Sequence, residues 1–233
     1  MTLTYGHFET DAELPGGIEV GHGFEDTSYR DKGIYRHGLK RVLDLVLVLL
    51  AMPFVAPLIA LLALVVMRDG GNPFYFQDRV GKGGRSFRMW KLRSMVVDAD
   101  ERMIAHLAAD PEARREWDET QKLKNDPRIT RFGQFLRKSS LDELPQLINV
   151  LTGDMSLVGP RPMMVSQKAL YPSTAYYELR PGITGYWQTA GRNRTSFAAR
   201  ASYDAAYERE LSFATDAEIL IRTVGVVIKG TGY

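Results

Sequence analysis

VLDLVLVLLAMPFVAPLIALLALVVM, residues 42–67, is nearly all apolar. A straight helix of this length would measure roughly 39 Å, against about 30 Å for the hydrocarbon core of a bilayer. Hydropathy alone therefore indicates a transmembrane helix. However, Pro53 and Pro57 lie in the middle of the segment, where each proline removes a backbone hydrogen bond and bends the helix.

Both flanks of this segment are cationic, which a simple span does not explain. The flanking basic residues are Arg36, His37, Lys40, Arg41, Arg68, Arg79, Lys82, Arg85 and Arg88. The positive-inside preference favours both ends only if they lie on the same side of the membrane. Two arms of about a dozen residues would each reach roughly 15–18 Å, about half the bilayer. We therefore expect a re-entrant helix over residues 37–68 that breaks at Pro53 and Pro57 and returns, with both ends cytoplasmic.

The other patterns predict a helix-rich α+β fold. Residues 74–92 alternate apolar and polar side chains around a glycine turn, which is typical of a small β-hairpin. Residues 97–124 are dense in charge and indicate solvated helices. Residues 141–151 and 216–228 carry apolar side chains at helical spacing. The second of these is amphipathic, so it either packs on the core or lies at the membrane interface.

This organisation predicts three parts. Residues 1–36 are polar and glycine-rich and form a disordered tail. Residues 37–68 form the membrane segment, and residues 69–233 form a cytoplasmic catalytic domain.

The composition excludes several kinds of chemistry. The chain has 233 residues, a net charge of +2 and no cysteine, which excludes disulfides, thiolate metal sites and cysteine nucleophiles. The small net charge argues against a nucleic-acid partner. Three of the four histidines lie in the first 37 residues. That placement argues against a histidine phosphocarrier, a Ser-His triad or a histidine-zinc site in the stretch that carries the acidic pair described next.

The stretch SSLDELPQLINVLTGDMSLVGPRP, residues 139–162, places an acidic pair, Asp142 and Glu143, next to a basic run. One interpretation is a capping box, in which Ser140 and Glu143 close the first turn of a helix. The other is a functional site, because two carboxylates can hold Mg²⁺ together with substrate phosphates.

Two arginines favour the functional interpretation. Arg161 lies between Pro160 and Pro162, and the two proline rings restrict its backbone. An arginine held in this way loses less entropy when it binds a phosphate through two hydrogen bonds. Arg137, five residues before Asp142, is the second candidate phosphate ligand. A metal, a phosphate clamp and a free carboxylate are the parts needed for phosphoryl transfer.

The chain resembles the monotopic polyprenyl-phosphate phosphoglycosyl transferases, also called the bacterial sugar transferase family. The resemblance covers residues 38–233 and rests on four motifs in order. These are KRVLDL (40–45), FYFQDRVGKGGRSFRMWKLRSM (74–95), DPRITRFGQFLRKSSLDELPQLINVLTGDMSLVGPRP (126–162) and RPGITGYWQTAGRN (180–193).

The resemblance implies an activity. Such enzymes move a sugar-1-phosphate from a UDP-sugar to undecaprenyl phosphate on the cytoplasmic face of the bacterial inner membrane, and they release UMP. They use Mg²⁺ and a covalent phosphosugar-aspartate intermediate, and the C-terminal GTGY is similar to members that start exopolysaccharide repeat units. The lipid acceptor places the site close to inner-membrane lipid, and a homo-oligomer remains an option.

The resemblance also implies roles for single residues. Asp142 is the nucleophile, and Glu143 is its partner at the metal. Arg137 and Arg161 bind phosphate. The remaining assignments are Arg180 and Arg192 near the nucleotide sugar, and Lys40, Arg41 and Asp44 in the motif where the chain enters the membrane.

Two other functions use the same features. A membrane-bound phosphohydrolase of lipid pyrophosphates would use the same metal and arginines with water as the acceptor. A non-catalytic membrane scaffold would tolerate any replacement of Asp142.

Overall fold

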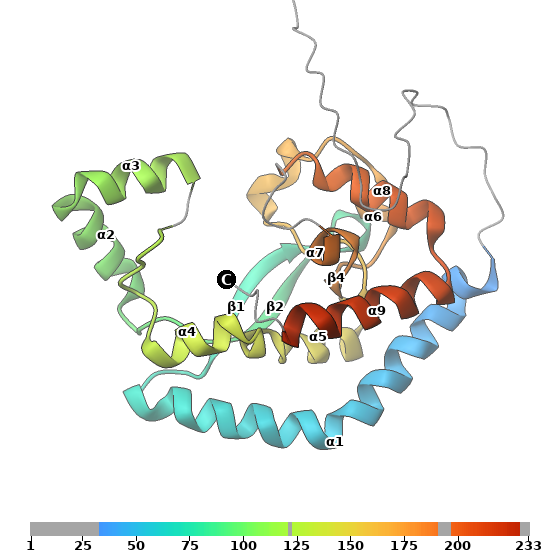
Figure 1. The fold of residues 1–233 in the computed structure, drawn as a ribbon, viewed down its shortest axis with the longest axis horizontal. Coiled ribbons are helices and arrows are strands. Elements are labelled where there is room, and N and C mark those ends of the chain that lie inside the picture. The colour runs from blue at the N-terminus through green and yellow to red at the C-terminus, as the bar shows by residue number, and fades with distance from the viewer. Residues whose placement is uncertain (1–32, 121–122, 191–196, 229–233) are drawn as a thin grey trace, which may run out of the picture. The chain divides into compact units, whose positions relative to one another are not determined.

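The computed structural model describes residues 33–120, 123–190 and 197–228. Most of the expected tail, residues 1–32, lies outside the described residues. The helices and strands, labelled in Figure 1, are α1 (Lys40–Val66), α2 (Ala99–Ala109), α3 (Pro111–Thr120), α4 (Arg131–Lys138), α5 (Gln146–Thr152), α6 (Ala175–Glu178), α7 (Tyr186–Ala190), α8 (Arg200–Glu210), α9 (Phe213–Ile228), β1 (Phe74–Val80), β2 (Ser86–Leu92), β3 (Ser156–Val158) and β4 (Gly182–Thr184). The expected helix-rich α+β fold with a small hairpin is confirmed.

The long apolar segment forms α1, which continues through both Pro53 and Pro57. Figure 1 shows that α1 bends about halfway along its length, the part of the helix in which the sequence has these prolines. The prolines therefore bend the helix without ending it, since each removes only its own backbone donor. With its flanking turns, Tyr35–Asp69, this helix is long and apolar enough to cross a membrane by length and composition.

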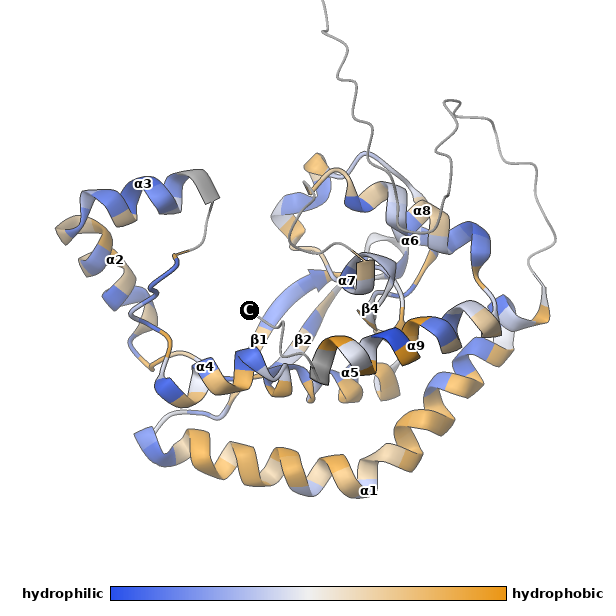
Figure 2. Ribbon diagram, in the orientation of Figure 1, coloured by the Kyte–Doolittle hydropathy of each residue, from blue (hydrophilic) through white to orange (hydrophobic). Residues whose placement is uncertain are grey.

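Among the described residues, α1 packs against the rest of the protein along one face. Its buried apolar residues are Val48, Ile59, Leu62, Ala63 and Val66. Large apolar side chains cover the opposite face, and Phe54 is the most exposed of them, at 80%. Figure 2 shows the resulting apolar colour along nearly the whole of α1. An exposed apolar surface of this size indicates contact with lipid or another apolar partner.

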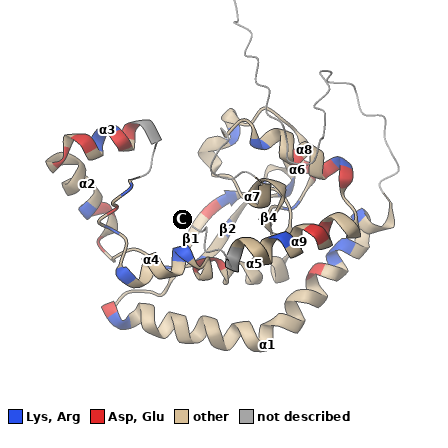
Figure 3. Cartoon of the chain, in the orientation of Figure 1, with Lys and Arg blue, Asp and Glu red and all other residues tan. Residues whose placement is uncertain are grey.

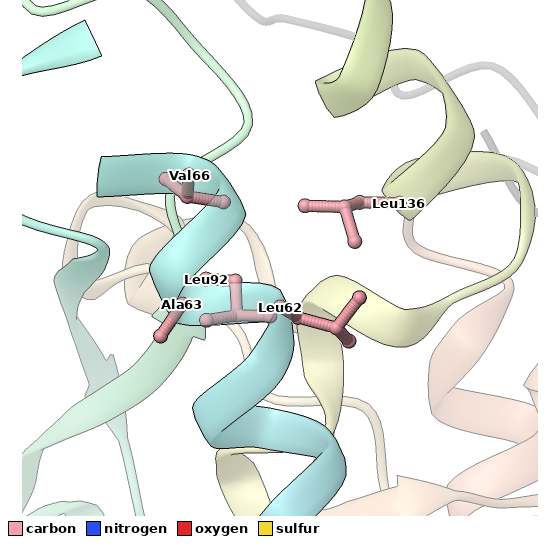
Figure 4. Close-up of a cluster of buried hydrophobic side chains, with 5 residues drawn as sticks. All are labelled: Leu62, Ala63, Val66, Leu92 and Leu136. Atoms are coloured by element: carbon pink, nitrogen blue, oxygen red, sulfur yellow. The ribbon is translucent and has the colours of Figure 1, made fainter. Parts of the chain in front are cut away.

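The second half of α1 packs against the hairpin and α4. Leu62, Ala63 and Val66 form a buried cluster with Leu92 of β2 and Leu136 of α4, shown in Figure 4. Leu141 and Leu144 pack against the same cluster. The turn that carries the acidic pair therefore packs on the cluster that joins α1, β2 and α4.

Strands β1 and β2 form the expected antiparallel hairpin, with Phe74 opposite Leu92 and Val80 opposite Ser86. The buried Asn149 of α5 fixes β2 through two hydrogen bonds. The Trp90 amide donates to Asn149 Oδ1 at 3.0 Å, and Asn149 Nδ2 donates to the Arg88 carbonyl at 2.8 Å. These hydrogen bonds thus fix the position of the hairpin relative to α5.

Helices α2 and α3 are rich in charged side chains. Figure 3 shows acidic and basic residues interspersed along both helices, whereas the middle of α1 has no charge. Pairs such as Arg102–Asp98, at 2.9 Å, are exposed and four residues apart. Such pairs contribute little to stability, which agrees with the expected solvated helices.

Strands β3 and β4 pair in parallel, with Ser156 opposite Gly182 and Val158 opposite Thr184. Three glycines allow this pair to approach closely. A Cβ atom on Gly182 would overlap the backbone nitrogen of Gly159, and one on Gly185 would overlap the Gly159 carbonyl oxygen. Gly159 is followed by Pro160 and Arg161, so this close packing fixes the start of the segment that carries the arginine.

We predict that Gly182→Ala destabilises the protein, because the added methyl group has no space between the two backbones. Overpacking of this kind costs about 1–3 kcal/mol or more. The control is Gly225→Ala in α9, where an added Cβ meets nothing within 4 Å; it should stabilise the helix by up to about 1 kcal/mol. Thermal unfolding of both variants provides the measurement. Equal melting temperatures would contradict the close packing.

Candidate active site

The acidic pair lies in a single 3₁₀ turn, Leu141–Glu143, between α4 and α5. Asp142 is 8% exposed, although it carries a carboxylate. The preceding residue, Ser140, has a left-handed backbone with φ of 56° and makes no side-chain cap. The capping-box interpretation is therefore wrong. A left-handed serine is uncommon and marks a backbone held in place by its surroundings.

Lys91 of β2 lies between the two carboxylates. Its Nζ is 2.7 Å from Glu143 Oε1 and 3.8 Å from Asp142 Oδ2. Burial raises the pKa of Asp142 above its usual value, and the Lys91 ammonium opposes this rise. Lys91 thus favours the ionised form of Asp142, whereas burial favours the protonated form.

Arg137 is close enough to act on Asp142 electrostatically. Its Nε donates to Ser94 Oγ at 2.9 Å. Burial lowers the pKa of Arg137, and the charges of Asp142 and Asp126 oppose that effect. The structure thus brings Arg137 and Asp142 into one electrostatic neighbourhood, but the arginine's role in phosphate binding stays a prediction.

Arg161 and Glu143 line the same small pocket. The residues lining it are Arg79, Met89, Lys91, Glu143, Gln146, Arg161, Pro162, Gly182 and Ile183. The structure therefore brings together the acidic turn, the hairpin and the proline-flanked arginine, which lie far apart in the sequence. The pocket is lined by both anionic and cationic side chains, as a phosphate transfer site requires.

Arg79 and Arg200 were not among the predicted site residues. Arg79 Nη1 donates to the Pro162 carbonyl at 3.2 Å, so Arg79 lies beside the segment that carries Arg161. Arg200 of α8 stacks on Trp187, with its guanidinium carbon 4.1 Å from the ring centroid, and Arg161 lies 5.8 Å from the same centroid. The pKa of Arg200 is lowered to about 10, by burial first and then by Arg161.

The hairpin register could have revealed Arg79 and Lys91. Alternate residues of paired strands share one face. Gln77 pairs with Met89, and Arg79 and Lys91 each lie two residues from one of these partners. Both basic residues therefore point from the same face as Met89. By contrast, the position of Arg200 depends on tertiary packing, and no local pattern in the sequence indicates it.

The predicted nucleotide-binding arginines receive less support. Arg180 is exposed, and its Nε donates to the Gly153 carbonyl at 3.0 Å. Arg180 is not among the residues that line the pocket. Arg192 lies outside the described residues. A role of these two arginines in nucleotide binding stays a prediction.

The side chains of Lys40, Arg41 and Asp44 bind the rest of the protein. Lys40 Nζ lies 2.6 Å from Asp216 of α9. Arg41 donates to the carbonyls of Val150 and Leu151 at the end of α5, at 2.5 and 3.1 Å.

Asp44 completes this set of anchors on β3. Its carboxylate accepts hydrogen bonds from Ser156 Oγ at 2.7 Å and from the Leu157 amide at 3.1 Å. The three side chains thus anchor the start of α1 on α5, α9 and β3. Their predicted role at the membrane is not excluded by these contacts and stays a prediction.

Comparison with known proteins identifies the family of this chain. The model of the bacterial sugar transferase family matches residues 35–230. A UDP-galactose-lipid carrier transferase of Erwinia amylovora is 49% identical over 83% of this chain and 41% of its own length. The exopolysaccharide production protein ExoY of Rhizobium meliloti is 43% identical over 83% of this chain and 87% of its own length. A UDP-glucose:undecaprenyl-phosphate glucose-1-phosphate transferase of Escherichia coli is 38% identical over 80% of this chain and 39% of its own length.

The chain belongs to the bacterial sugar transferase family. It spans about two-fifths of the length of the Erwinia and Escherichia relatives and most of the length of ExoY.

Proposed function

We propose that this protein transfers a sugar-1-phosphate from a UDP-sugar to undecaprenyl phosphate and releases UMP. The observation that carries the proposal is a single pocket lined by Glu143, Lys91, Arg79 and Arg161, with Asp142 beside Lys91. The names of the relatives support the substrates, because one includes UDP-galactose and a lipid carrier and another includes UDP-glucose and undecaprenyl phosphate. The name of ExoY supports a role in exopolysaccharide production, which we place at the first membrane step of assembly.

Asp142 supplies the nucleophile. A carboxylate needs no histidine base at neutral pH, provided that it is ionised, and the Lys91 ammonium favours ionisation. An oxygen of Asp142 attacks the phosphorus nearer the sugar. The bond from that phosphorus to the bridging oxygen breaks, and the electron pair leaves with UMP. The product is a phosphosugar-aspartate.

The second step returns the carboxylate. A phosphate oxygen of undecaprenyl phosphate attacks the same phosphorus, and the bond to Asp142 breaks. The lipid diphosphate sugar leaves, and the step requires no proton. The arginines around the pocket offset the negative charge of the phosphates in both steps.

Asp142 and Glu143 would also hold Mg²⁺. The fit rests on the donor set, since these adjacent carboxylates already share one cation, the Lys91 ammonium. Within the described ranges no group of three or more acidic or histidine side chains could hold a metal. The remaining ligands would therefore be substrate phosphates and water. Bound Mg²⁺ would neutralise charge on the phosphates.

We further propose that α1 is a re-entrant helix and that the protein lies on the cytoplasmic face of the bacterial inner membrane. The bend in α1, the cationic flanks and the exposed apolar face support this topology. The anchored side of α1 would hold the catalytic domain close to the headgroups, where the acceptor phosphate lies.

The first prediction from the proposed function concerns turnover by the full chain in lipid nanodiscs. The nanodiscs contain undecaprenyl phosphate, and Mg²⁺ is added with a panel of UDP-sugars that includes UDP-galactose and UDP-glucose. We expect UMP release and formation of the lipid-linked sugar with at least one donor. Asp142→Asn should abolish UMP release both with and without acceptor. Asp118→Asn is the control, because that carboxylate is exposed on α3 and pairs with Arg114 at 2.9 Å; it should leave turnover unchanged.

Other results would contradict the proposed activity. Phosphate release that depends on Mg²⁺ but not on undecaprenyl phosphate would indicate a phosphohydrolase. Absence of turnover with every donor, in a folded protein, would favour a scaffold. Unchanged turnover by Asp142→Asn would remove Asp142 from the mechanism.

The second prediction concerns topology. The native chain has no cysteine, so a single introduced thiol is labelled cleanly. Gly33→Cys and Arg115→Cys place thiols at exposed positions. In the sequence the first precedes the membrane helix, and the second follows it, on α3. Both should resist an impermeant thiol reagent in intact spheroplasts and react after permeabilisation. Labelling of only one of them in intact spheroplasts would mean that α1 spans the membrane.

A further inference from the structure

Two arginines from different parts of the chain line the pocket, and a third, Arg200, lies beside one of them at the Trp187 ring. Arg79 comes from β1, Arg161 follows β3, and Arg200 begins α8. Arg79 and Arg161 both line the pocket, and Arg161 and Arg200 share the Trp187 ring.

One buried apolar cluster holds all three arginines in place. It includes Val80, Met163 and Ala201, and each lies one or two residues from one of the arginines. The Val80 amide also donates to the Met163 carbonyl at 3.0 Å, which joins β1 to the segment after Arg161. The arginines are therefore presented by a packed core.

The charges of this arginine group are only partly compensated. The buried Nε atoms of Arg79 and Arg200 have no hydrogen-bond partner among the described residues. Asp204 is the acid that acts most strongly on Arg200, but it accepts a hydrogen bond from Tyr171 at 2.6 Å, and burial raises its pKa to about 7. Guanidinium groups stay protonated in proteins, so their mutual repulsion persists until an anion binds.

We propose that Arg79, Arg161 and Arg200 form a single phosphate subsite that is used twice in each catalytic cycle. It first holds the phosphate of the departing UMP and then holds the phosphate of the incoming lipid acceptor. This inference rests on the proposed function and specifies how its two substrates share the site.

The chemistry of two in-line displacements requires this sharing. In the first step Asp142 and the UMP oxygen lie on opposite sides of the transferred phosphorus. In the second step Asp142 is the leaving group, so the attacking lipid phosphate must lie opposite Asp142. That position is the one UMP has left. Arg79 and Arg161 line the same pocket as Glu143, the neighbour of Asp142, which suits them to both phosphates.

The test measures the two half-reactions separately on the full chain in nanodiscs. Rapid quenching gives the rate of UMP release without acceptor. Undecaprenyl phosphate is then added to the isolated phosphosugar-enzyme, and the rate of its discharge is measured. Arg200→Gln should slow both half-reactions by about 100-fold, the effect typical of removing one donor to a developing anion. Arg200→Lys, which keeps the charge but loses the planar fork, should recover part of each rate.

Arg209→Gln is the matched control, because Arg209 lies on the same helix and is exposed. It should leave both rates unchanged. UMP added during discharge should compete with undecaprenyl phosphate. Melting temperatures identify any variant that fails to fold, and Arg79→Gln then replaces Arg200→Gln, with the same expectation.

Several results would overturn the shared subsite while leaving the proposed function intact. These are slowing of only one half-reaction, slowing of neither, or inhibition of discharge by UMP that excess undecaprenyl phosphate does not relieve. A wild-type protein that forms no phosphosugar-enzyme would instead overturn the proposed function itself.

Discussion

The packing of Leu62, Ala63 and Val66 against Leu92 and Leu136 is the constraint on which the rest of the structure depends. It joins the second half of an apolar helix to the hairpin and α4. Because Leu141 and Leu144 pack against the same cluster, the turn that carries Asp142 is joined through it to the helix, the hairpin and α4. The helix with the exposed apolar face and the turn of the candidate site therefore share one packed core.

The charged groups of the candidate site include one close ion pair, between Lys91 and Glu143 at 2.7 Å. Lys91 contacts both carboxylates, and Arg79 and Arg161 line the same pocket. Burial weakens the ionised form of Asp142, and the basic groups oppose that effect. A pocket lined by a carboxylate and several basic groups suits a ligand that carries both a metal and phosphates. The close backbone contacts of Gly159 and Gly182 fix the start of the segment that carries Arg161.

Much of this structure could be predicted from local patterns. The apolar run, the alternation over residues 74–92 and the charge of residues 97–124 predict α1, the hairpin and the solvated helices, because each pattern reflects burial along one element. The acidic pair was identified as a candidate site, but its backbone was not predicted, because the left-handed Ser140 depends on tertiary packing. For the same reason the sequence does not indicate Arg200. Its position depends on the core in which Ala201 packs with Val80 and Met163.

The central claim is that Asp142 forms a covalent bond to the transferred phosphosugar. The most direct measurement is the intact-protein mass of wild type and Asp142→Asn after brief incubation with the UDP-sugar donor and Mg²⁺, without acceptor. The proposed mechanism predicts a mass increase of one sugar phosphate on the wild type and none on the variant. An equal adduct on both proteins, or no adduct on a wild type that releases UMP stoichiometrically with the enzyme, would contradict it.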